Sequence, residues 1–135
     1  MRHRPTLLLT VLLAASLARA AGSGADTEPT RALYLRYCSA CHGPNGRGDG
    51  IAGTFMRPKP IDLTTIAREN GGTFPFERVR ASIDGTKTVG PHGDPDMPVW
   101  GEMFHEEAGW DATRRAETRS KLLLLTEYVR SIQQR

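Results

Sequence analysis

Two thiols and an imidazole lie within five consecutive residues of this chain, at Cys38, Cys41 and His42. This C-x-x-C-H pattern is typical of covalent haem c attachment, in which each thiol adds to one vinyl group of the porphyrin to form a thioether. Two intervening residues on a helical turn let both sulfurs face the same porphyrin edge. The imidazole that follows can then bind the iron from one side. The pattern therefore predicts one covalently bound haem c, with His42 as the proximal iron ligand.

Other uses of the same residues fit the sequence less well. A thioredoxin-like redox pair belongs in a βαβ context, whereas helix-forming residues without a strand pattern precede Cys38. A zinc site needs about four well-spread ligands, and the adjacent Cys41 and His42 cannot easily serve one tetrahedral ion. A disulfide between the two cysteines would close a very small, strained ring. Haem attachment is therefore the preferred interpretation.

A second iron ligand can come from the glycine- and proline-rich stretch at residues 86–98, which contains both Met97 and His92. A thioether is a soft, neutral donor that stabilises ferrous iron, so a His/Met pair raises the reduction potential. Ligation by His92 would instead give a bis-histidine iron with a lower potential. Met56 and Met103 are expected to serve in packing. Trp100 follows the ligand stretch, and we expect its ring to pack on the haem and its indole N–H to reach a propionate.

The N-terminal residues predict export. Arg2, His3 and Arg4 form a positive head, and the apolar run at 7–17 is too short to span a bilayer. Ala18 and Ala20 are small residues at the two recognition positions for cleavage after Ala20. We therefore expect a signal peptide at 1–20, a short linker at 21–29 and one domain at 30–135. The alternative is an uncleaved anchor. Export to the periplasm suits the chain, because both thiols would be consumed by the cofactor in an oxidising compartment.

The charge balance of the exported chain argues against a nucleic-acid or anionic-membrane partner. Removal of the signal peptide takes away Arg2, Arg4 and Arg19, which leaves 15 of the 18 basic residues against 15 acidic ones. Such a chain is close to neutral, so it lacks the basic excess that attracts polyanions. The remaining residues are enough for one domain with one core.

The apolar pattern predicts an all-α fold. Helices are expected at 30–41, at 62–70 after the cap Asp62, at 73–83 before Gly85, around Trp100, Met103 and Phe104, and at 111–134. The glycine-rich segment at 43–50 must be a loop, which we expect to wrap the proximal face of the haem. The apolar faces of the two middle helices are expected to wall the porphyrin.

The run from Tyr34 to Gly43 resembles the N-terminal helix of class I c-type cytochromes, and the likeness extends over the whole exported chain. It implies the cytochrome c fold, about four to five helices with long loops around one haem. In that family the first helix crosses the last, so Leu125 and Tyr128 are expected near Tyr34. Thr30 is a departure, because the family has glycine at that position.

The same resemblance implies the roles of further residues. In the family, a methionine followed by proline at about this distance after C-x-x-C-H is the axial ligand, which selects Met97. A proline carbonyl in the loop after the motif often accepts the other imidazole N–H of the proximal histidine. Pro44 and Pro58 are the candidates for that acceptor.

These residues favour a one-electron carrier over an enzyme. With His42 and Met97 on the iron, no coordination position remains for a substrate. We expect a monohaem cytochrome c that shuttles electrons between a periplasmic dehydrogenase or membrane quinol-oxidising complex and a terminal oxidase or other acceptor, as a monomer or as a subunit of a complex.

Two other hypotheses remain. A dedicated haem subunit of a periplasmic oxidoreductase complex fits the low lysine content, since only Lys59, Lys87 and Lys121 could steer a partner. A gas sensor or peroxidase-like haem would require an absent or displaceable Met97.

Overall fold

The computed structural model describes residues 28–86, 97–108 and 111–134. Its elements, in chain order, are α1 (Glu28–Tyr37), α2 (Ser39–His42), the short 3-10 helices η2 (Ala52–Phe55) and η3 (Leu63–Thr65), α3 (Ile66–Glu69), α4 (Phe76–Asp84), α5 (Trp100–Ala108) and α6 (Ala112–Ser131). The described residues contain no strand, so the predicted all-α class is confirmed. The expected signal peptide, most of the linker and His92 lie outside the described residues.

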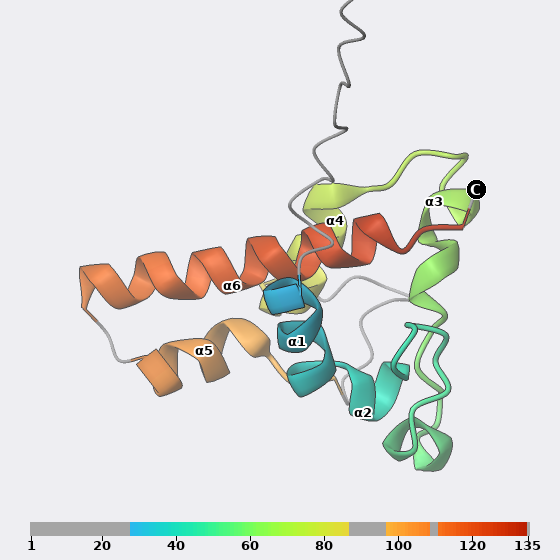
Figure 1. Ribbon diagram of the computed structural model, residues 1–135, viewed down its shortest axis with the longest axis horizontal. Helices are drawn as coiled ribbons and strands as arrows, with labels where there is room; N and C mark the ends of the chain where they lie inside the picture. Colours follow the sequence, from blue (N-terminus) through green and yellow to red (C-terminus); the bar gives the residue numbers. More distant parts are fainter. Residues whose placement is uncertain (1–27, 87–96, 109–110, 135) are drawn as a thin grey trace, which may run out of the picture.

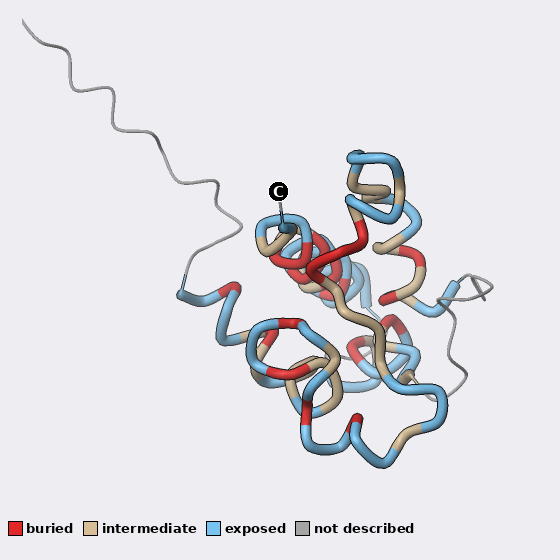
Figure 2. Tube along the Cα trace, turned by 90° about the vertical axis from the view of Figure 1, so that its right-hand side faces the viewer, coloured by how far each residue is buried: buried red, intermediate tan, exposed pale blue. Residues whose placement is uncertain are grey.

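The long helix α6 is the element on which the others pack. In Figure 1 it runs across the molecule, with α5 alongside it, α1 crossing it and α4 behind it, and all three contact it. Figure 2 shows that the buried segments face one another in the interior between the helices. The buried residues of α6 are Thr118, Leu122, Leu125, Thr126, Tyr128 and Val129. Their three- and four-residue spacing turns one stripe of the helix toward the core.

The predicted crossing of the first and last helices is present. The ring of Tyr34 on α1 stacks on that of Tyr128 on α6, with 4.6 Å between their centroids, and Leu125 belongs to the same buried cluster. Thr30 is only 2 % exposed. Thr30 is therefore accommodated inside the packing of α1.

Two helix boundaries differ from the sequence prediction for local reasons. The helix predicted at 30–41 begins at Glu28 and is interrupted at Cys38, although the Cys38 N–H still donates to the Tyr34 carbonyl at 2.9 Å. The helix predicted at 73–83 begins only at Phe76. Pro75 disfavours a helical conformation in the residue before it, which delays the start. The predicted stop is correct, since Gly85 ends α4 with a φ of 80°.

The predicted starts at Asp62 and Asp111 and the end at Asn70 are confirmed, whereas α6 ends at Ser131 and not near Gln134. The Asp62 side chain accepts the Thr64 N–H at 2.8 Å at the start of η3, and α3 ends at Asn70. The Asp111 side chain likewise accepts the Arg114 N–H at 3.0 Å and caps α6. Both aspartates satisfy a backbone donor that a helix start leaves unpaired.

The loop after α2 folds back onto that helix. The N–H groups of Gly48 and Gly50 donate to the carbonyls of His42 and Cys41 at 2.9 and 3.2 Å. A Cβ at Gly50 would lie 2.4 Å from the Ala40 carbonyl oxygen, so only glycine allows this approach. The glycines of the predicted loop thus hold its backbone against the end of α2.

The C-terminal residues fasten η3 and α3 to α6. Gln133 donates to the Leu63 carbonyl at 2.6 Å and accepts the Ala67 N–H at 2.8 Å, while the Gln134 N–H donates to the Thr64 carbonyl at 2.9 Å. Figure 1 shows the C-terminal end of the chain beside α3. Within the described residues, no helix combines the length and apolar composition needed to cross a bilayer.

Candidate cofactor site

An apolar pocket is enclosed by several parts of the chain. Cys38 and α2 lie on one side of it, and the segment from Ile61 through η3 to α3, the helix α4, Met97 and the helix α6 form the rest. Its empty volume is about 700 Å³, a figure that includes space open to solvent. Its lining residues are Cys38, His42, Ile61, Leu63, Ile66, Arg78, Val79, Ser82, Ile83, Met97, Leu125 and Val129. The predicted apolar walls from the two middle helices are therefore present.

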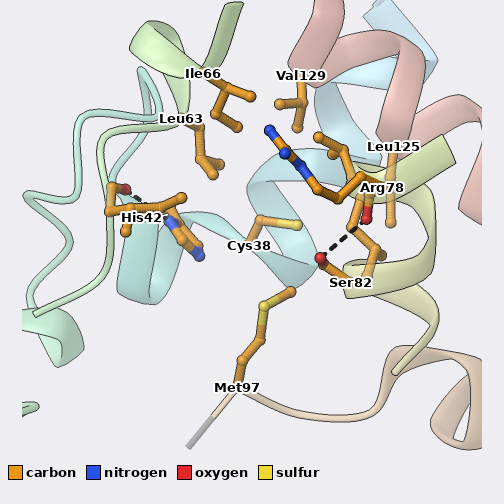
Figure 3. A pocket seen from close by; sticks show the side chains of 12 residues that line it. Cys38, His42, Leu63, Ile66, Arg78, Ser82, Met97, Leu125 and Val129 are labelled. Carbon is orange, nitrogen blue, oxygen red and sulfur yellow. Dashed lines mark hydrogen bonds between the residues drawn. The ribbon is translucent and has the colours of Figure 1, made fainter. Parts of the chain in front are cut away.

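The pocket brings together three of the five predicted site residues. Figure 3 shows Cys38 beside the imidazole of His42, with the side chain of Met97 extending from below toward Cys38, and all three residues line the pocket. His42 and Met97 are far apart in the sequence and enter from different elements. An arrangement with nitrogen and thioether donors on one apolar cavity matches the donor set of a His/Met haem iron.

His42 is oriented by a backbone carbonyl. Its Nδ1 lies 3.3 Å from the Ile61 carbonyl oxygen, which can only accept, so Nδ1 carries the proton and Nε2 is left as the metal-binding atom. Burial lowers the pKa of His42, which favours the neutral imidazole that binds a metal. The acceptor is neither Pro44 nor Pro58, so that prediction was wrong.

The physical reason lies in the path of the segment before η3. The Leu63 N–H donates to the Gly46 carbonyl at 2.7 Å, which pins this segment to the loop beyond α2 and carries the Ile61 carbonyl to the imidazole. Pro44 and Pro58 are both exposed. A spacing rule along the chain could not reveal an acceptor that depends on this contact between two loops.

The two cysteines remain free thiols, not bonded to each other. Burial, with the neighbouring Cys41 as a second cause, raises the pKa of the Cys38 thiol to about 12. Cys38 lines the pocket, whereas Cys41 is half-buried on α2 and is not among the lining residues. Both thiols are chemically available for the predicted thioethers.

A buried hydrogen bond supports the turn that carries these residues. The hydroxyl of Tyr34 donates to the Gly43 carbonyl at 2.8 Å, one residue after His42. Tyr34 itself is fully buried, and burial raises the pKa of its hydroxyl far above the usual range. The first helix therefore holds the end of α2 through a neutral, buried donor.

Trp100 lies outside the pocket wall. Its ring belongs to an aromatic cluster, 5.3 Å from the ring of Tyr37 and 5.6 Å from that of Phe104 between centroids. It is absent from the residues that line the pocket, although it packs against the same buried cluster as Cys38 and Met97. α5 instead uses Trp100 to pack on α1.

The other methionines are separate from the site. Met56 and Met103 do not line the pocket. Met103 is 41 % exposed, so its predicted packing role was wrong. The reason is the rotation of α5, which turns Phe104 fully inward and Met103 toward solvent.

Sequence reasoning missed Arg78 and Ser82 in the pocket wall. Both lie on α4 next to the predicted apolar positions Val79 and Ile83. Their four-residue spacing was a usable signal, since it places both residues on one face of α4 beside the apolar positions. In the described part of the chain, no group of three or more His, Cys, Asp or Glu side chains gathers as a metal cluster.

Comparisons with protein-family models, curated proteins and solved structures found no match for this chain.

Proposed function

We propose that this chain is an exported one-electron carrier, a monohaem c-type cytochrome with haem c held by Cys38 and Cys41 and with His42 and Met97 as axial ligands. The observation that carries the proposal is the convergence of Cys38, His42 and Met97 on one apolar pocket. This convergence joins the C-x-x-C-H motif to a second donor more than fifty residues away along the chain. The finer fold assignment, the cytochrome c fold, belongs to the same proposal.

Each group of residues would have a different role in such a site. The two thiols would tether the porphyrin, the Ile61 carbonyl orients His42, and the apolar walls would cover much of the ring. The haem supplies the ferric/ferrous couple when bound. With His42 and Met97 both holding the iron, the bound haem would exchange one electron and would offer no coordination site to a substrate.

The location and partners follow from the sequence. The N-terminal pattern supports export to the periplasm, and the nearly neutral exported chain supports brief contacts with weak charge steering. Suitable donors are a periplasmic dehydrogenase or a membrane quinol-oxidising complex, and a terminal oxidase is a suitable acceptor.

The deciding experiment is the optical and magnetic spectrum of the purified protein with and without Met97→Ala. Wild-type protein should show covalent haem and a long-wavelength Met–Fe(III) charge-transfer band. Met97→Ala should lose that band, bind carbon monoxide rapidly when reduced, and have a lower reduction potential. Met103→Ala is the matched control, because this exposed methionine lies outside the pocket and should leave the spectrum unchanged.

The same spectra discriminate between the alternatives. An unchanged spectrum in Met97→Ala would transfer the ligand role to His92. Rapid carbon monoxide binding by the reduced wild-type protein would favour a sensor or peroxidase-like haem. Colourless purified protein would end the haem proposal altogether.

A second candidate function, a dedicated haem subunit of a periplasmic oxidoreductase complex, is favoured by two exposed apolar side chains. Ile51 and Phe55 are 79 % and 84 % exposed. They flank Gly53, which packs on the Cys41 carbonyl, so they lie close to α2. Exposed apolar residues that form a contiguous patch beside a site can mark an interface, so these two side chains are its candidates.

Purification from the source organism separates the two functions. A stoichiometric complex that survives high salt and dissociates in the Ile51→Ser/Phe55→Ser variant would establish the subunit. A monomer that is reduced by its partner in brief encounters would establish the carrier, and a steep dependence of that rate on salt would count against the subunit.

A further inference from the structure

The segment that carries Met97 is packed against the end of α4. Val99 lies over Gly85, the residue that ends α4, and a Cβ on that glycine would lie 2.5 Å from Cγ1 of Val99. Gly101 lies against Asp84, and a Cβ on Gly101 would lie 2.7 Å from the Asp84 carbonyl oxygen. Figure 3 shows Met97 on the segment that runs into α5. Both contacts therefore follow Met97 by only a few residues.

The close approach of the two helices depends on the missing side chain of Gly101. This glycine is buried in the first turn of α5, and glycine is a poor helix former. The Asp84 oxygen that faces it belongs to the backbone at the end of α4, so it cannot rotate away as a side chain could. A methyl group at Gly101 must therefore push α5 away from α4.

The helix α4 is also a wall of the pocket, through Val79, Ser82 and Ile83. Ile83 belongs to the buried cluster against which Met97 packs. A segment that is docked on the end of α4 is thus held at a fixed place relative to this wall. The docking of residues 97–101 therefore determines how Met97 enters the pocket.

The helix α5 is anchored on its other side by α6. Phe104 is fully buried in the core cluster, and Glu107 pairs with Lys121 of α6 at 3.5 Å. With α5 held there, a wider gap between α4 and α5 must displace the first turn of α5 and the segment before it. Met97 is the pocket residue on that segment.

We infer that Gly101 is a positioning residue for the thioether of Met97, because it lets residues 97–101 dock on the end of α4. The inference rests on the proposed function, in which this sulfur binds the iron opposite His42. A metal ligand needs supporting structure that holds it in the productive geometry. Gly101 does not line the pocket, so it acts through the backbone that joins it to Met97.

The test compares the purified, haem-loaded wild type with Gly101→Ala and with the control Ala116→Gly. Ala116 is exposed on α6 and does not line the pocket, so glycine there should weaken the helix without moving Met97. In Gly101→Ala the Met–Fe(III) charge-transfer band should weaken or vanish. Carbon monoxide should bind the reduced variant roughly tenfold faster or more, because overpacking displaces the thioether. Covalent haem should be retained, since the C-x-x-C-H motif is untouched.

Two further variants keep the test decisive if Gly101→Ala does not fold. Val99→Ala removes the methyl groups that lie over Gly85, at a position that is 39 % exposed, so its fold should survive. This variant should also bind carbon monoxide faster than the wild type. In Gly101→Ala/Asp84→Ala, the carboxylate that crowds the new methyl group is removed, and the charge-transfer band should be partly restored.

The outcomes separate this inference from the proposed function. If Met97→Ala loses the band while Gly101→Ala or Val99→Ala keeps both the band and the carbon monoxide rate of the wild type, Gly101 does not position the ligand and the haem proposal stands. An equal loss of the band in Ala116→Gly would also overturn the inference, since the band would then follow stability alone. If wild-type protein carries no haem, or if Met97→Ala leaves its spectrum unchanged, the ligand assignment and the inference fail together.

Discussion

Tyr34 links the first helix to the candidate site through one hydroxyl group. That hydroxyl donates to the Gly43 carbonyl at 2.8 Å, next to the iron-binding candidate His42, and the ring stacks on Tyr128 of α6. A fully buried donor without its partner would cost its desolvation, so the bond fixes where α2 ends. At the residue scale, the geometry of the site thus depends on a side chain outside it.

Replacing Tyr34 with phenylalanine should lower the free energy of unfolding by about 0.5–1.5 kcal/mol, because the variant leaves the Gly43 carbonyl without its donor. Denaturant titration measures the change. Tyr37→Phe is the control, since its hydroxyl bonds to Glu107 at an exposed position and should cost less. Equal losses in the two variants would contradict the role of Tyr34.

The stability of the wild type and that of Tyr34→Phe should depend differently on pH. Burial raises the pKa of Tyr34 above its ordinary value of 10.0, so the unfolded chain loses this proton first. The buried, protonated Tyr34 therefore contributes its full stabilisation at pH values below that ordinary pKa. This stabilisation is lost as the pH rises above it. The stability of the wild type should therefore fall more steeply in alkali than that of Tyr34→Phe, and parallel curves would refute this.

At the scale of elements, the glycine loop and α2 behave as one unit. The backbone of Gly50 lies so close to α2 that an added Cβ would meet the carbonyl oxygens of Ala40 and Cys41 at 2.4 and 2.6 Å. Both contacts are with backbone atoms, which cannot rotate away. Any side chain at this position must push the loop from the helix that carries the motif.

We expect Gly50→Ala to destabilise the protein by about 1–3 kcal/mol, the usual cost of overpacking. The visible spectrum of the loaded protein should also change, because α2 carries His42. Gly71→Asn provides the control, since a Cβ there meets nothing within 4 Å and asparagine tolerates its φ of 67°. Thermal unfolding and absorbance measure both effects. A Gly50→Ala variant with unchanged stability and an unchanged spectrum would show that the loop can move away from α2.

At the scale of the whole molecule, the core and the pocket share their side chains. Leu125 belongs to the buried cluster with Tyr34 and Phe104, and it also lines the pocket together with Val129. A ligand in the pocket would therefore complete the same apolar interior that holds α1, α4 and α6 together. Stability and cofactor binding are coupled in such a small domain.

Leu125→Ala should cost about 2–5 kcal/mol, because it removes a fully buried side chain from core and pocket at once. Its neighbour Leu124 is 41 % exposed, and Leu124→Ala should stay within about 0.5 kcal/mol of the wild type. Unfolding by urea of the loaded protein measures both. Similar losses for the two leucines would show that α6 does not bury the face described here.

Local patterns in the sequence were enough for part of this description. The helical class, the caps at Asp62 and Asp111 and the stop at Gly85 depend on each residue and its immediate neighbours. The contact between Tyr34 and Tyr128 followed from the family resemblance. Likewise the C-x-x-C-H motif lies within five consecutive residues, so the sequence alone identified Cys38 and His42 as candidate site residues.

Only the tertiary structure decided which distant groups meet around the pocket. The Ile61 carbonyl reaches His42 because two loops are pinned together, and Arg78 enters the wall because of the way α4 lies against α6. Trp100 instead joins an aromatic cluster, since the rotation of α5 sets its direction. Sequence periodicity states which face of a helix is apolar, whereas the position of that face relative to other segments depends on how all the helices pack.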